Sequence, residues 1–114
     1  MDAHRLAEER SVEYHRVLAQ RLPRQPEILE DARRRVRGWL NAAAESGSLV
    51  PEYAQRWSAV LAGESAAIAA FLVERSELAD ELRQSSPFAG SLEPRERWKI
   101  WRDTRDRLDP TPPP

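Results

Sequence analysis

Proline spacing is the feature that most constrains the fold of this 114-residue chain. Its nine prolines lie only where helical periodicity starts, stops or is absent. Proline is tolerated in the first turn of a helix but costs about 3 kcal/mol in its interior. Between the prolines, apolar residues recur three and four positions apart, and no stretch shows the sustained alternation typical of a strand. The sequence therefore predicts an all-α protein.

The periodic stretches predict five helices, over residues 2–22, 26–46, 51–62, 64–84 and 94–108. The second has the most complete set of signals, because it starts with proline and ends before Gly47, a residue suited to a left-handed cap. The fourth keeps its apolar seam in phase across Ser76, so we expect one continuous helix there. A restart capped by that serine is the alternative.

The chain is long enough for one domain with one hydrophobic core, to which four tryptophans contribute. Five helices with short connections predict antiparallel neighbours in a compact single-domain bundle over residues 1–109. Residues 110–114 contain four of the nine prolines and are expected to form a disordered tail.

Composition excludes several classes of function. The net charge of −1 removes the simplest electrostatic argument for a nucleic-acid or membrane-surface partner. The absence of cysteine excludes disulfides and thiolate chemistry. The longest apolar run, residues 66–73, is far shorter than the roughly 20 residues that cross a membrane. With no apolar signal sequence at the N-terminus, we expect a cytoplasmic protein.

The residue types that carry catalysis form no recognisable motif. His4 and His15 would lie about 16 Å apart along one helix, too far to share a metal ion, and both are expected on the surface. Neither a Gly-x-Ser-x-Gly motif nor a Glu-x-x-His motif occurs. We therefore expect a non-enzymatic protein without catalytic residues, metal or cofactor. A small helical enzyme would need a pocket with converging polar groups.

Residues 66–73 are apolar on every side and should be covered all round. A central position in the protein's own core satisfies this requirement. The alternative is that a second chain covers one side, with Ala66, Ala67 and Ala70 allowing close helix approach. Residues 64–86 carry a net charge of −3, which suits a basic partner or serves solubility. The first function we expect is therefore protein binding, either to a partner or to a second copy.

An aromatic residue in the predicted loop, Phe88, either folds back onto the core or contacts a partner. In the next helix the predicted apolar stripe is Trp98, Trp101, Arg105 and Leu108. We expect Phe88 and Trp98, with the three alanines above, to form the partner interface.

The segment Ser86-Pro-Phe-Ala-Gly-x-Leu-x-Pro-Arg-Glu-Arg-Trp98, together with Glu9-Arg-Ser-x-x-x-His15, resembles a family of short helical proteins from GC-rich bacteria. This resemblance implies no established activity, ligand or site. In size and helical character the chain is also similar to the neutralising partners in bacterial toxin–antitoxin pairs. The dedicated DNA-binding segment of many antitoxins is missing.

The alternative function is that of a nucleic-acid-binding accessory protein. Arginines cluster on the second and fifth predicted helices and, if side by side, would form a stripe for phosphates. The residues expected to bind in that case are Arg34, Arg37, Arg95 and Arg102. Acidic residues at helical spacing would partly neutralise them.

Overall fold

The computed structural model describes residues 2–110, and every regular element in that range is a helix. Residues 2–110 form six helices rather than the five expected. Their bounds are α1 Ala3–Arg21, α2 Pro26–Ser46, α3 Glu52–Leu61, α4 Ser65–Leu72, α5 Glu77–Arg83 and α6 Pro94–Leu108. Of the predicted tail, residues 111–114 lie outside the described part of the chain.

The expectation of one continuous helix over residues 64–84 is wrong, because the helix stops and restarts. Ser76 caps α5, its hydroxyl accepting a hydrogen bond from the backbone N–H of Ala79 at 3.1 Å. The guanidinium of Arg83 donates to the carbonyls of Leu72 (3.3 Å) and Glu74 (2.7 Å) at the end of α4. Both ends of the break therefore have hydrogen-bonding partners, which makes the interruption energetically tolerable.

α2 has the bounds that the sequence predicts. Proline occupies its first turn, where the missing N–H costs nothing. At its end Gly47 has φ +69°, and the N–H of Ser48 donates to the carbonyl of Ala43 at 3.0 Å. This left-handed cap closes the helix and turns the chain toward α3.

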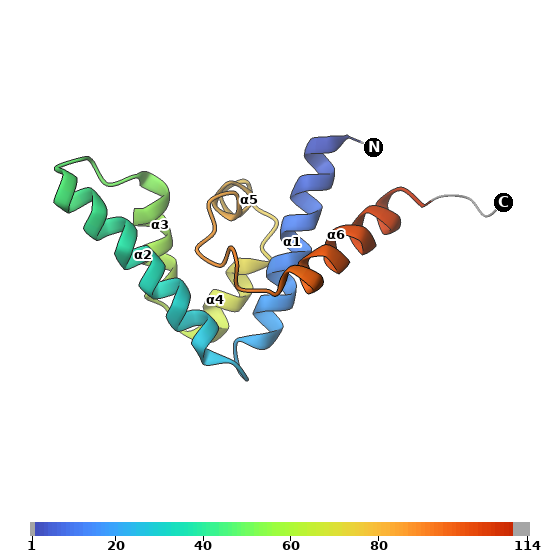
Figure 1. The fold of residues 1–114 in the computed structure, drawn as a ribbon, viewed down its shortest axis with the longest axis horizontal. Coiled ribbons are helices and arrows are strands. Elements are labelled where there is room, and N and C mark those ends of the chain that lie inside the picture. Colours follow the sequence, from blue (N-terminus) through green and yellow to red (C-terminus); the bar gives the residue numbers. More distant parts are fainter. Residues whose placement is uncertain (1, 111–114) are drawn as a thin grey trace.

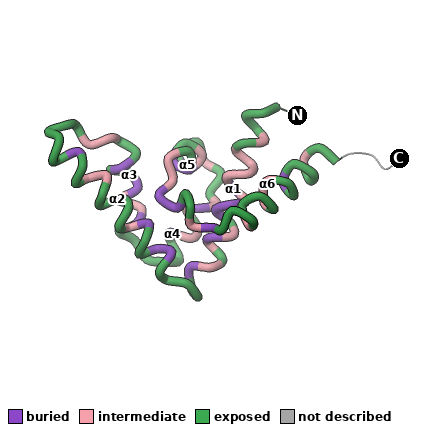
Figure 2. The backbone as a smooth tube through the Cα atoms, in the orientation of Figure 1, coloured by how far each residue is buried: buried purple, intermediate pink, exposed green. Residues whose placement is uncertain are grey.

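The helices form two arms that meet in the middle of the molecule (Figure 1). α2 and α3 pack together as one arm, while α1 and α6 pack together in the other. α4 packs against α1 at the base, and α5 with the loop that follows it lies between the arms. The molecule measures 59 × 31 × 25 Å along its principal axes. Figure 2 shows buried residues gathered toward the centre and exposed residues at the outer ends of the arms.

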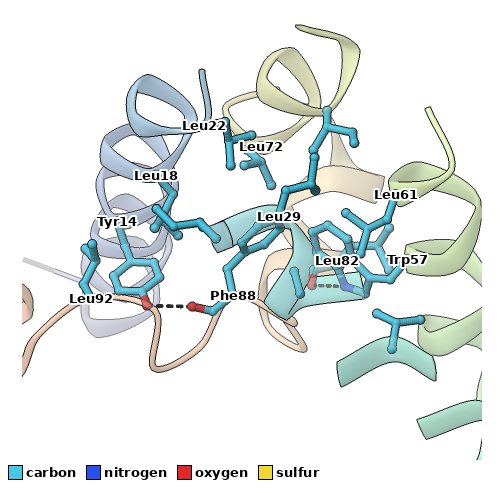
Figure 3. Close-up of a cluster of buried hydrophobic side chains, with 14 residues drawn as sticks. Tyr14, Leu18, Leu22, Leu29, Trp57, Leu61, Leu72, Leu82, Phe88 and Leu92 are labelled. Atoms are coloured by element: carbon cyan, nitrogen blue, oxygen red, sulfur yellow. Dashed lines mark hydrogen bonds between the residues drawn. The ribbon is translucent and has the colours of Figure 1, made fainter. Parts of the chain in front are cut away.

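The hydrophobic core lies where the arms meet, and Trp57 and Phe88 are its largest fully buried side chains (Figure 3). Their rings meet edge to face, with centroids 6.1 Å apart. The indole N–H of Trp57 donates to the carbonyl of Leu82 at 3.0 Å, so its one polar atom is satisfied. Leucines from α1, α2, α3 and α4 surround the two rings.

Residues 84–93, the loop between α5 and α6, join the two arms. The hydroxyl of Tyr14 on α1 donates to the carbonyl of Phe88 at 2.7 Å and accepts from the N–H of Ser91 at 3.2 Å. From the other arm, the guanidinium of Arg35 on α2 donates to the carbonyls of Pro87 and, at 3.0 Å, Ala89. This loop is therefore a structural element with fixed partners on both sides.

Across residues 2–110, none of the helices combines the length and the apolar character that crossing a bilayer requires.

Candidate functional site

The most developed concave surface lies between α1, α6 and the loop that follows α5. This cleft has a volume of about 430 Å³, within the range of ligand-binding sites. Tyr14 and Trp101 form its aromatic wall, and their rings pack edge to face at 6.3 Å. Its floor carries polar atoms from Ser11, His15 and Ser86.

The cleft continues along α1 into two further depressions against α5. The first shares Ala7, Ser11, Arg83 and Gln84 with the cleft, and the second is bordered by carboxylates from both helices. We call the three together the groove. Its acidic rim consists of Glu8, Glu77, Asp80 and Glu81.

The acidic rim keeps part of its charge unpaired. Glu8 lies 3.0 Å from the exposed imidazole of His4, and Asp80 pairs with Arg83. Among residues 2–110, Glu77 and Glu81 have no ion-pair partner, and both are exposed. The groove therefore offers an aromatic cleft at one end and free negative charge at the other.

His15 and Ser86 form a hydrogen-bonded pair at the floor of the cleft. The imidazole Nδ1 lies 2.7 Å from the carbonyl of Ser11, which can only accept, so Nδ1 carries the proton. Nε2 then accepts from the hydroxyl of Ser86, also at 2.7 Å. The Ser86 oxygen in turn accepts from the N–H of Phe88 at 3.1 Å.

This pair has the spacing of a nucleophile and its base, but the electrostatics oppose that role. The pKa of His15 is lowered to about 4, chiefly by burial; the hydrogen bond that its Nδ1–H donates to the Ser11 carbonyl raises the pKa in part, and the positive charge of Arg83 lowers it. A general base works best with a pKa near the operating pH, usually with a carboxylate to stabilise the imidazolium. Here a backbone carbonyl takes the place of that carboxylate.

The expectation that His15 lies on the surface is wrong, since only 2% of it is exposed. The residues that bury it are distant in sequence. Its ring packs edge to face against Phe88, with centroids 6.3 Å apart, and accepts a hydrogen bond from Ser86, 71 positions away. Of the two segments that carry the family resemblance, one holds Ser11 and His15 and the other holds Ser86 and Phe88. They meet at this point of the structure. His4, in contrast, is exposed as expected.

The residues predicted for a partner interface are not brought together. Ala66, Ala67 and Ala70 are exposed on the outer side of α4, whereas Ile68 and Leu72 of the same helix are buried. The apolar run is therefore covered on one side only. No residue of α4 lines the groove.

The two aromatic residues predicted for that interface have opposite environments. Phe88 is 0% exposed, so it folds back onto the core and contributes nothing to the surface of the folded chain. Trp98 is 67% exposed. The predicted stripe on its helix is wrong in this respect, because α6 turns Ile100, Trp101 and Thr104 toward α1.

The arginines predicted for nucleic acid are exposed but fall into two separate groups. Arg34 and Arg37 lie on α2, and Arg95 and Arg102 on α6, in different arms (Figure 1). They form no common stripe. Arg34 pairs with Asp31 at 2.8 Å, and Arg102 lies 3.7 Å from Asp103.

Two neighbouring arginines of α2 serve the fold. Arg33 donates to the carbonyls of Leu61 (3.0 Å) and Gly63 (3.4 Å) between α3 and α4, and Arg35 holds the loop as described above. Two arginines of the α2 cluster expected to bind phosphates therefore already donate hydrogen bonds to backbone carbonyls of the chain.

No family model matches the chain, and no curated protein or solved structure matches it either. Within the described range, no three histidine or acidic side chains lie close enough together to hold a metal ion.

Proposed function

We propose that this protein is a non-enzymatic binding module whose groove receives a basic segment of a partner protein. The observation that carries the proposal is the composition of the groove, an aromatic cleft continuous with a rim that bears the unpaired Glu77 and Glu81. An amphipathic helix with one large apolar side chain and flanking arginines matches both halves of that surface.

The charges suit recognition of a partner more than chemistry. Opposite charge around a binding surface speeds encounter and rejects acidic competitors, even where it adds little affinity. The polar groups on the cleft floor are already paired with one another, since His15 bonds Ser11 and Ser86. A module of this kind acts by covering its partner, which is how a neutralising antitoxin works.

Binding of designed peptides tests this function. A helical peptide with one Trp and three Arg on one face is titrated into the protein and followed by calorimetry and by backbone NMR shifts. We expect saturable binding, with shifts at Ala7, Gln84 and Ala89, and at least tenfold weaker binding when the peptide arginines are replaced by glutamate. Shifts confined to other surfaces, or equal binding of both peptides, would overturn the proposal.

Protein variants give the matched comparison. Glu77→Lys combined with Glu81→Lys removes the unpaired charge and should abolish binding, while Glu45→Lys, on the exposed end of α2, should leave it unchanged. Ala70→Glu tests the outer side of α4. A loss of binding in that variant alone would mean that the partner binds this side of α4 and not the groove.

The nucleic-acid function is tested with the same protein. Retardation of duplex DNA that weakens with salt and with Arg37→Ala and Arg95→Ala would favour that alternative over the groove.

A further inference from the structure

The exposed side of α6 carries the features that the groove requires of a partner. Arg95, Trp98, Arg102 and Arg105 follow one another at intervals of three, four and three residues, so they share one side of the helix. All four are exposed, and Trp98 has the largest exposed fraction of the tryptophans and phenylalanines, at 67%. We call these four residues the α6 stripe.

The α6 stripe and the groove differ in charge in the way that two docking surfaces should. α6 contains six basic and three acidic residues, whereas residues 64–86, which supply most of the acidic rim, have a net charge of −3. Among the described residues, the stripe pairs with two acidic neighbours, Asp103 and Asp106, each adjacent in sequence to its arginine and exposed. Such pairs contribute little, so the arginines can exchange them for other partners.

A chain's α6 stripe is not part of its own groove. The α6 residues that line the cleft are Arg97 and Trp101, which lie on a neighbouring side of the helix. Trp98 lies outside that lining and is left in solvent in a single copy.

We propose that the groove's partner is a second copy of this chain, with the α6 stripe of one copy docked in the groove of the next. This inference rests on the proposed function and names its ligand. Trp98 occupies the aromatic cleft, and the stripe arginines face Glu77 and Glu81. Each contact uses the stripe of one copy and the groove of the next, so a pair still has one stripe and one groove free, and association is head-to-tail and continues beyond a dimer.

Sedimentation equilibrium on the full chain tests the proposal. The average mass should rise with concentration above the 13.1 kDa of one chain. The association constant should fall as salt is raised, because the paired charges are near the surface. Trp98→Ala should weaken association roughly thirtyfold if this residue is the central anchor.

Two complementary variants test whether the stripe and the groove are the two contacting surfaces. Variant A, Glu77→Lys with Glu81→Lys, keeps only a working stripe, and variant B, Trp98→Ala with Arg102→Ala, keeps only a working groove. Each alone should be monomeric. Mixed, they should form pairs of two chains and nothing larger, while Glu45→Lys should associate as the unmodified chain does.

The outcomes distinguish this inference from the proposed function. A chain that stays monomeric at all concentrations, or variants A and B that fail to pair when mixed, would overturn self-association. If the Trp/Arg peptide still binds the groove in that case, the binding module stands with another partner. If the peptide also fails to bind, both proposals are wrong.

Discussion

The loop at residues 84–93 and helix α6 are adjacent in the chain, but the loop buries its aromatic residue and α6 leaves one of its own exposed. Phe88, in the irregular segment, is 0% exposed, while Trp98, in a regular helix ten residues later, is 67% exposed. The loop has fixed hydrogen-bonding partners in both arms, and α6 packs along α1 through one side only. Backbone partners, more than helical regularity, decide which aromatic residue enters the core.

This difference matters for function, because it separates residues that hold the fold from residues that remain available for contact. The loop closes the core and orders the cleft floor. α6 supplies Trp101 to the cleft from one side and presents Trp98 to solvent from another.

Replacing each of these two aromatic residues by alanine tests the difference in their burial most directly. Phe88→Ala should lower the free energy of unfolding by about 3–5 kcal/mol, since it removes the centre of the core. Trp98→Ala should change it by about 0.5 kcal/mol or less in the dilute monomer. Urea unfolding followed by circular dichroism measures both. Similar losses in the two variants would show that Phe88 and Trp98 contribute equally to the core.

The pH dependence of stability tests the burial of His15, which the loop helps to cover. The pKa of this residue is lowered to about 4 in the folded protein, against about 6.5 when unfolded. The unfolded chain therefore binds a proton first as the pH falls, and stability decreases from pH 6.5 down to about 4. The decrease attributable to His15 is about 3 kcal/mol.

His15→Gln isolates this contribution, because the carboxylates that also titrate in acid, Glu9 and Glu96 among them, are retained. The stability of the variant should fall less steeply than that of the unmodified chain between pH 6.5 and 4. His4→Gln, at an exposed position, is the control and should keep the original slope. An equal slope in all three proteins would mean that His15 is accessible to solvent.

The bond between α2 and the loop should contribute less to stability than the ring of Phe88 or the burial of His15. Arg35→Met removes the donor for the carbonyls of Pro87 and Ala89, and we expect a loss of about 2 kcal/mol. Arg37→Met, two positions on, should change stability by less than about 0.5 kcal/mol, since it is exposed and without an ion pair among the described residues. Chemical unfolding of the two variants side by side measures the difference.

The smallest effect is expected at the bond between α1 and the loop. Tyr14→Phe keeps the ring but removes the hydroxyl shared by Phe88 and Ser91, at a cost of about 1–1.5 kcal/mol. Tyr53→Phe removes the hydroxyl of a tyrosine that is 39% exposed and serves as the control. If both variants unfold at the same urea concentration as the unmodified chain, the hydroxyl does not hold the loop.

The parts of the fold that the sequence predicts well are those set by neighbouring residues. α2 is an example, because Pro26, its apolar seam and Gly47 all act within a turn or two of where they stand. The break between α4 and α5 depends on Arg83 reaching back to the carbonyl of Leu72, eleven positions earlier. The spacing of apolar residues does not predict such a contact.

The groove was beyond prediction for a similar reason. Its floor pairs residues 71 positions apart, and its walls come from α1, α5, the loop and α6. In the sequence, the net charge of −3 over residues 64–86 is the feature that points to a basic partner. The sequence does not predict the exposed side of α6, because Trp98 and Trp101 are only three positions apart and helical spacing alone does not say which of them faces α1.

The unequal exposure of the tryptophans gives the protein an intrinsic optical reporter. Trp57 is fully shielded and Trp39 and Trp101 are partly covered, so collisional quenching by iodide should fall mainly on Trp98. The nearby arginines attract the anion and sharpen this preference. Binding of a second copy or another partner over the Trp98 indole should therefore reduce quenching by iodide and shift the fluorescence emission to shorter wavelength. No attached dye is needed.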